Sequence, residues 1–275
     1  MPNFAVASDA LKNTFRGWRL SLVQLAGNAA LFGLFVLWLS IPVATALHLA
    51  GNILLGALVV AATLLLEAGT LRYFWALNSE ESAGLGATFR IALRHLPAFA
   101  LATASLCLLW YFAGTADSYE ETLPNYLRSM SPQFVRNLFS LHVYENLVDA
   151  GLFALQWIVA PGLVLPWLVA TAAAGFGGFA RRGFGAWKKC AGNILYWGIV
   201  AVCAVVGVYL IGKIMDWTPD FRTSTLSHET ASLIWRGTLS YVLLIWAWLL
   251  ACSMAGRLCG DTVTLGKNVP GQPAA

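Results

Sequence analysis

Residues 14–49 read TFRGWRLSLVQLAGNAALFGLFVLWLSIPVATALHL, a short basic and aromatic start followed by a long apolar run. From Leu20 to Leu49 the run contains no Asp, Glu, Lys or Arg. A helix needs roughly 20 predominantly apolar residues to cross a bilayer core of about 30 Å. The apolar region of a cleaved signal peptide is shorter, at about 7 to 15 residues. We therefore predict that this run is a retained membrane-spanning helix.

The remainder of the chain has the same apolar character. Its composition is 59% hydrophobic and 11% charged, whereas soluble domains carry about a quarter charged residues. The predicted fold is an all-α polytopic membrane protein with a single transmembrane domain over residues 1–260 and a disordered cytoplasmic tail over 261–275. A turn at Gly51-Asn52 is expected to separate the first two spans. The six predicted spans cover residues 20–48, 53–77, 96–114, 146–175, 194–215 and 233–257.

A basic and aromatic motif, which we call the elbow, precedes the first, third and fifth spans. The three copies are Thr14-Phe15-Arg16, Thr88-Phe89-Arg90 and the degenerate Ala186-Trp187-Lys188. Weak internal similarity of this kind is usual for repeats in membrane folds. The spacing predicts three helical hairpins, each preceded by a short interfacial helix whose aromatic residue sits at headgroup level and whose basic residue contacts lipid or a partner.

The distribution of charge predicts the orientation of the chain. With the N-terminus and C-terminus both in the cytoplasm, the cytoplasmic side holds 12 of the 17 basic residues and 5 of the 13 acidic residues. Cytoplasmic loops of membrane proteins carry an excess of Lys and Arg. We therefore expect this orientation, with both termini in the cytoplasm.

Polar residues inside the first two spans predict a contact between them, which we call the clamp. Span one carries Gln24 and Asn28, and span two carries Thr63, Glu67 and Thr70. An acid inside a membrane needs a partner or a function. Matching of depth predicts that Glu67 pairs with Asn28 and that Thr70 pairs with Gln24. The alternative interpretation makes Glu67 a proton or substrate site.

Arg72 lies close to the predicted cytoplasmic boundary of span two. Long basic side chains near the end of a span commonly extend to the headgroups. We expect Arg72 to do the same.

A candidate metal site lies at the outer end of the fourth span. His142, Glu145 and Asp149 are spaced to share one helix face, and His228 and Glu229 in the other outer loop could complete a shell. Imidazole and carboxylate groups are ligands for zinc and similar cations. The alternative is a solvated polar face on a surface helix, and the signature of zinc hydrolases is absent.

Two prolines, Pro161 and Pro166, interrupt the fourth span, with Gln156 one turn earlier. Each interior proline removes a backbone hydrogen bond, so we expect a kink near the middle of the membrane. Such a break either lines a substrate path or lets a long helix curve around its neighbours.

Several chemistries have no sequence support. The five cysteines show no paired spacing typical of metal sites. The chain also has no phosphate-binding loop, and its basic residues are explained by topology. We therefore expect no cofactor and no nucleic-acid partner.

The rhythm of elbows and hairpins resembles the six-helix membrane-anchor region of bacterial glycerophosphodiester phosphodiesterases, and also uncharacterised bacterial inner-membrane families. Those phosphodiesterases keep their catalytic residues in a separate soluble barrel. No catalytic residue of theirs has a counterpart in this chain. The resemblance therefore implies a membrane-embedded module without enzymatic chemistry, located in a bacterial inner membrane.

These observations predict a non-enzymatic scaffold or accessory subunit, with the lipid bilayer and other membrane protein subunits as partners. A small permease for an apolar or amphiphilic molecule is the main alternative, and a cavity reaching Glu67 would favour it. A membrane-embedded metal-dependent enzyme is a weaker alternative, which convergence of His142, Glu145 and His228 would favour.

Overall fold

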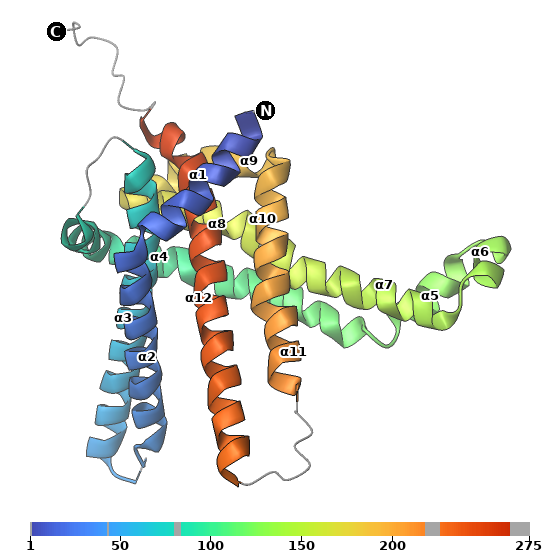
Figure 1. Cartoon of the computed structure of the whole chain (residues 1–275), viewed down its shortest axis with the longest axis horizontal. Coiled ribbons are helices and arrows are strands. Elements are labelled where there is room, and N and C mark those ends of the chain that lie inside the picture. The colour runs from blue at the N-terminus through green and yellow to red at the C-terminus, as the bar shows by residue number, and fades with distance from the viewer. Residues whose placement is uncertain (1, 43, 80–83, 218–225, 265–275) are drawn as a thin grey trace, which may run out of the picture.

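The computed structural model describes residues 2–42, 44–79, 84–217 and 226–264. Within these ranges the chain forms helices and turns, with no strand (Figure 1). Six helices are long and apolar enough to cross a membrane, so the predicted all-α polytopic membrane fold is confirmed. The candidate spans are Trp18–Ser40, Ala46–Asn78, Leu85–Phe112, Leu141–Ala191, Ile194–Asp216 and His228–Gly260.

The first hairpin consists of α1 (Pro2–Arg16), α2 (Trp18–Ser40) and α3 (Ala46–Asn78). Its turn lies before Ala46, and the predicted turn at Gly51-Asn52 is wrong because both residues are inside α3. Pro42 explains the end of α2, since a proline pushes the residue before it into extended backbone, as observed at Ile41. The Thr45 side chain then caps α3 by accepting a hydrogen bond from the His48 backbone N–H.

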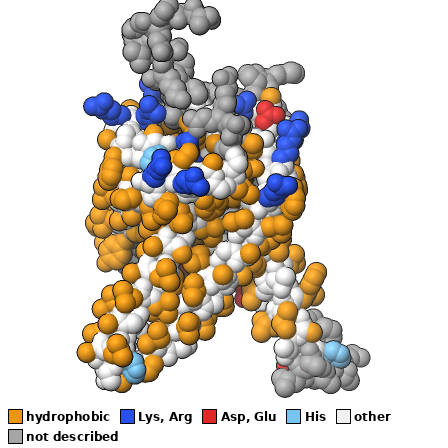
Figure 2. All heavy atoms as spheres, turned by 90° about the vertical axis from the view of Figure 1, so that its left-hand side faces the viewer, with side chains coloured by type: hydrophobic (Ala, Val, Ile, Leu, Met, Phe, Trp, Pro, Cys, Tyr) orange, Lys and Arg blue, Asp and Glu red, His pale blue; other side chains and the backbone are white. Residues whose placement is uncertain are grey.

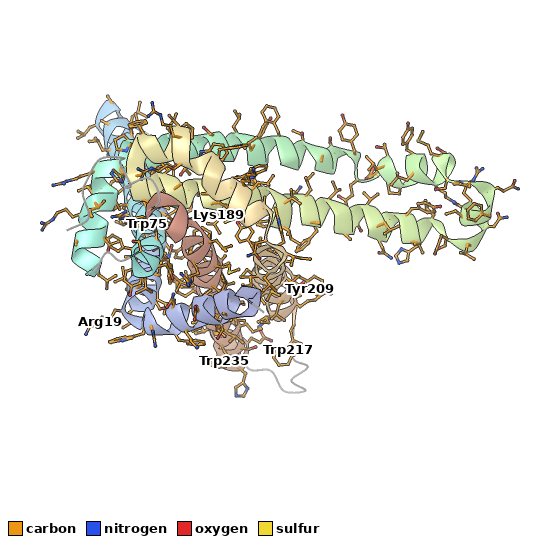
Figure 3. The ribbon with its side chains drawn as sticks, turned by 90° about the horizontal axis from the view of Figure 1, so that it is seen from above. Arg19, Trp75, Lys189, Tyr209, Trp217 and Trp235 are labelled. Carbon is orange, nitrogen blue, oxygen red and sulfur yellow. The ribbon has the colours of Figure 1, made fainter. Side chains whose placement is uncertain are left out.

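The second hairpin runs across the others and projects to one side (Figures 1 and 3). Its start, including the second elbow, belongs to α4 itself, and α4 bends around an interior proline, Pro97. We call the projecting part, residues 103–154, the arm. The elements of the hairpin are α4 (Leu85–Gly114), η1 (Thr115–Tyr119), α5 (Leu123–Met130), α6 (Gln133–Leu138), α7 (Leu141–Ala154), η2 (Leu155–Val159) and α8 (Ala160–Gly177).

The sharpest break of the fourth span is at Gly175, not at the prolines. Gly175 has φ of 60°, in the left-handed region that glycine adopts without strain. Pro161 is the second residue of α8, which begins after the π-helical turn η2, and Pro166 lies inside α8. Beyond the break the chain folds back so closely that a Cβ on Gly178 would lie 1.9 Å from the Ala170 carbonyl oxygen.

The third hairpin follows this reversal. Its two long helical segments, α10 to α11 and α12, extend in the same general direction as α2 and α3 (Figure 1). Its elements are η3 (Gly178–Arg182), α9 (Gly183–Ala191), α10 (Ile194–Ala204), η4 (Val205–Leu210), α11 (Ile211–Asp216) and α12 (Leu226–Thr264). The predicted disordered tail is helical over its first four residues, and 265–275 lie outside the described residues.

The core of the bundle is built around α3, which packs against α2, α4, α8 and α12. Bulky side chains from several helices fill it, among them Phe74, Trp75, Phe99, Tyr196, Leu249 and Met254. Lys and Arg side chains gather at one end of the molecule, which we call the basic end, while hydrophobic side chains cover most of the surface below it (Figure 2). This pattern fits a protein surrounded by a lipid bilayer.

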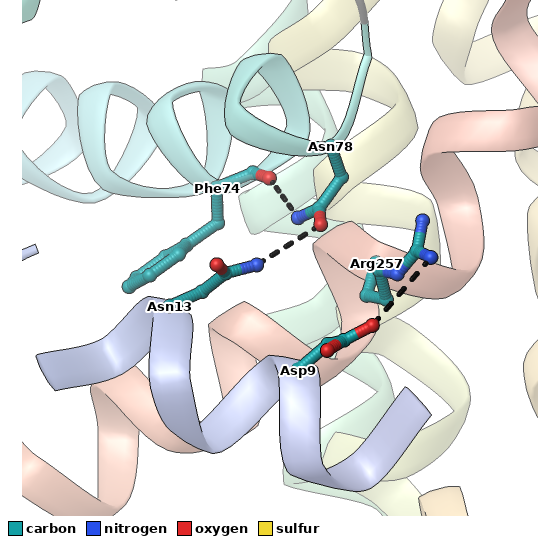
Figure 4. Close-up of polar contacts among 5 residues, drawn as sticks. All are labelled: Asp9, Asn13, Phe74, Asn78 and Arg257. Carbon is teal, nitrogen blue, oxygen red and sulfur yellow. Dashed lines mark hydrogen bonds and ion pairs between the residues drawn. The ribbon is translucent and has the colours of Figure 1, made fainter. Parts of the chain in front are cut away.

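Helix α1 lies over the basic end of α12. The Ser253 hydroxyl donates to the Ala10 carbonyl at 2.8 Å, and Arg257 lies 3.8 Å from Asp9. On the other side, Asn13 donates to the Asn78 side chain of α3 at 3.1 Å (Figure 4). The first interfacial helix is therefore tied to both the first and the third hairpin.

Candidate functional site

The predicted clamp between α2 and α3 forms in part. The Gln24 amide Nε2 donates to the Thr70 hydroxyl at 2.5 Å, and both side chains are buried, so this pairing is confirmed. Asn28 does not reach Glu67 but donates to the Gln24 side-chain oxygen at 2.6 Å. Thr63 is exposed and bonds only the Val59 carbonyl of its own helix, so it does not belong to the clamp.

Glu67 pairs with a different helix from the one predicted. Its Oε2 accepts a hydrogen bond from the indole Nε1 of Trp248 in α12 at 2.6 Å, so the predicted Glu67–Asn28 pair is wrong. The sequence prediction paired residues that lie at the same depth in the membrane. Depth alone does not show which neighbouring helix faces Glu67, so it could not identify Trp248. Gln24 also interacts with the carboxyl group. These polar contacts therefore join α2, α3 and α12, not the first hairpin alone.

A second buried polar group surrounds the break at Gly175. A helix that ends leaves its last carbonyl groups without helical partners, and side chains from two neighbouring helices meet them here. Arg72 Nη1 of α3 donates to the Ala173 carbonyl at 2.9 Å, and His95 Nδ1 of α4 lies 3.1 Å from the Ala172 carbonyl. The positive charge of Arg72 is favourable at this position, because the C-terminal end of a helix carries a partial negative charge.

The expectation that Arg72 extends to the headgroups is wrong. Its side chain is buried, and the guanidinium lies 4.2 Å from the ring centre of Trp75. Figure 3 shows Trp75 among the helices of the bundle. The sequence signal for these contacts of Arg72 and His95 is the glycine-rich string at 175–178. Glycines mark a chain reversal, and the carbonyl groups left free at such a reversal need hydrogen-bond donors.

The elbows share one pattern of burial. Their first residues are buried, with exposed fractions of 3% for Thr14, 1% for Thr88 and 0% for Ala186. Their basic residues are exposed in all three copies, namely Arg16, Arg90 and Lys188. The elbows therefore pack through their first residue and present their charge at the surface.

The aromatic residues of the elbows differ from one another. Phe15 is exposed, as expected for a residue at headgroup level, and Trp187 stacks on Phe184 with ring centres 5.4 Å apart. Phe89 instead packs so closely on α3 that a Cβ on Gly69 would lie 2.4 Å from its ring. The headgroup role predicted for Phe89 is therefore wrong, because this ring holds α4 against α3.

The candidate metal ligands do not converge. His142 Nδ1 and Glu145 Oε2 lie 3.3 Å apart on the exposed face of α7, and Asp149 is exposed one turn further on. His228 is at the start of α12, well away from the arm (Figure 1). Among the described residues, no group of three His, Cys, Asp or Glu side chains could hold a metal ion.

A large cavity of about 900 Å³, open to the surface of the molecule, lies between α4, η2 and α8, α10 to α11, and α12. Trp248 forms part of its wall, and the Trp248 indole N–H points to Glu67. Glu67 is not among the residues that line this cavity. A second, open groove of about 610 Å³ lies between α2, α3 and α4 beside Trp38 and Pro97. Neither space had been predicted, because both depend on how the hairpins diverge.

Comparison with known proteins adds no assignment. No protein-family model matches the chain, and no curated protein or solved structure is significantly similar to it.

Proposed function

We propose that this chain is a non-enzymatic scaffold or accessory subunit of a complex in the bacterial inner membrane, with both termini in the cytoplasm. The observation that carries the proposal is that the arm projects from the bundle. In its outer part, helices α5 and α7 pack against each other. Its outer part carries large exposed apolar side chains, including Leu109, Tyr111, Phe112 and Leu147. Large exposed apolar patches mark sites of protein or membrane interaction.

The distribution of polar groups supports a role without enzymatic chemistry. Glu67, Gln24 and Arg72 are each engaged in contacts between helices. The pair of His142 and Glu145 is exposed on the arm, with no third ligand beside it among the described residues. The permease is less well supported, because Glu67 is not among the residues that line the large cavity.

The shared burial pattern of the elbows supports an internal repeat of three interfacial segments and hairpins. We include this repeat in the proposal, together with the resemblance to the anchor region of the phosphodiesterases. A repeat of this kind would present three basic surface positions at the same side of the membrane, available to anionic lipid or to a partner.

Site-specific photocrosslinking in native membranes tests the proposal. A photoreactive phenylalanine analogue at Phe112 and another at Leu138 are expected to capture the same protein, because both positions are exposed on the arm. The matched control is Leu54, which is equally exposed but lies on α3, and it should give no protein adduct. Adducts with lipid alone at both arm positions would rule out the scaffold role of the arm.

A further inference from the structure

The cavity between α4, α8, α10 and α12 has the size of a ligand site. Its volume of about 900 Å³ falls in the range of roughly 300 to 1,000 Å³ that is typical of small-molecule sites. The described residues that line it include no Asp, Glu, Lys, Arg or His. An occupant must therefore be held by apolar contacts.

Two polar groups of the cavity wall already have hydrogen-bond partners within the protein. The Thr103 hydroxyl donates to the Phe99 carbonyl at 2.9 Å, and the Trp248 indole donates to Glu67 at 2.6 Å. A phosphate, carboxylate or sugar placed inside would lose its water without gaining partners from these groups, at a high cost in free energy. The lining thus selects a hydrocarbon segment.

Departures from regular helix occur on two sides of the cavity. The π-helical turns η2 and η4 both contribute lining residues, Trp157 from the first and Gly207 from the second. Such turns are rare in helices and frequently occur at functional sites. Gly212 also lines the wall, and a Cβ there would meet no atom within 4 Å.

A pair of tryptophans lies along one side of the cavity. Trp110 and Trp157 pack edge to face, with ring centres 5.8 Å apart, and both are partly exposed. Tryptophan is enriched where the apolar core of a membrane meets the headgroups, since the ring is apolar and its N–H is polar. This pair is suited to contact the ester region of a lipid whose chain enters the cavity.

We propose that the cavity binds an acyl chain of a membrane glycerophospholipid, with its ester and headgroup outside, beside Trp110 and Trp157. The walls come from four candidate membrane spans, so phospholipid surrounds the site at high local concentration. This site goes beyond the scaffold role and does not depend on it.

Photolabelling with phosphatidylglycerol that carries a diazirine on its acyl chain tests the proposal. The purified protein is reconstituted in vesicles of phosphatidylethanolamine and phosphatidylglycerol that contain this probe, irradiated and mapped by mass spectrometry. Adducts are expected to concentrate on cavity-lining residues of 103–110 and 155–164. Two filling variants, Gly207→Leu and Gly212→Phe, should reduce these adducts about fivefold or more, because the new side chains occupy the space of the chain.

The control variant is Gly198→Phe, which lies on exposed α10 surface outside the cavity and should leave the adducts unchanged. Adducts on the exposed face of α3 report surrounding lipid and should be equal in all variants. Equal cavity labelling in both filling variants would overturn the proposal. Displacement of the probe by palmitic acid or an isoprenoid alcohol, but not by unlabelled phosphatidylglycerol, would overturn it in favour of that occupant.

Discussion

At the scale of single residues, the hydrogen bond from Trp248 to Glu67 explains how an acid is retained inside an apolar bundle. The carboxyl group accepts from the indole at 2.6 Å and also interacts with Gln24, so its polar atoms face other polar groups and not lipid. The contact joins α3 and α12, which are distant in sequence. Glu67 therefore has a structural partner that accounts for its presence in a span.

Replacing Glu67 with Leu should lower the free energy of unfolding by about 1 to 2 kcal/mol, because the Trp248 N–H loses its acceptor. Glu67→Gln should retain most of the stability, since its amide oxygen can still accept. The measurement is reversible unfolding in detergent micelles. Thr63→Val on the same helix serves as the control, because Thr63 is exposed and bonds only its own helix.

A double-mutant cycle with Trp248→Phe separates this hydrogen bond from packing effects. In the background of the Trp248→Phe variant, the substitution Glu67→Leu should cost less than in the natural chain, since the N–H is already gone. Equal costs in the two backgrounds would show that the bond contributes nothing to stability.

At the scale of elements, the apolar runs predicted which segments are helical, but not how helices end. The first turn was misplaced because Gly51-Asn52 has turn-forming residues, while Pro42 and the Thr45 cap are the signals that the chain uses. In the fourth span, the kink was predicted at the two prolines, whereas the chain reverses at Gly175. Pro161 is at the start of α8, where a missing N–H is tolerated, and Pro166 is accommodated inside α8, so neither proline marks the break.

Some contacts between helices could be predicted from the sequence, and others could not. The Gln24–Thr70 pair was predictable, because its two helices are consecutive and their depths can be counted from one shared boundary. The partners of Glu67 and Arg72 come from α12 and α8, and their positions follow only from the packing of all three hairpins.

Two adjacent glycines test the tight reversal after α8. Gly178→Ala should cost more than about 3 kcal/mol or prevent recovery of folded protein, since its Cβ would collide with the Ala170 backbone. Gly177→Ala should be neutral or stabilising by up to about 1 kcal/mol, because its Cβ meets no atom within 4 Å and alanine favours helix. Size-exclusion profiles and thermal unfolding in detergent provide the comparison. Similar behaviour of the two variants would contradict the close approach of the two segments.

At the scale of the whole molecule, the basic end and the arm define two distinct regions of surface. Lys and Arg side chains gather at the basic end (Figure 2), while the arm projects from the side of the bundle (Figure 1). The topology that we propose from the charge distribution places the basic end in the cytoplasm and the tip of the arm on the outer side.

Cysteine labelling measures this orientation directly. In a chain whose five natural cysteines are replaced by alanine, Asn125→Cys at the arm tip should react with a membrane-impermeant maleimide in intact cells. Lys12→Cys on α1 should react only after the membrane is permeabilised. Both positions are exposed, so access to reagent is set by the side of the membrane alone. Reversed labelling would refute the proposed cytoplasmic termini.

The π-turns η2 and η4 have a consequence for how this fold can vary. A π-turn accommodates one residue more than an α-helical turn, so the helix on either side keeps its packing while the wall bulges locally. Loss of one residue from either turn would return it to α-helical geometry and reshape the adjoining part of the cavity wall. The capacity of the cavity can therefore change through single-residue insertions and deletions, without any substitution among the residues that hold the bundle together.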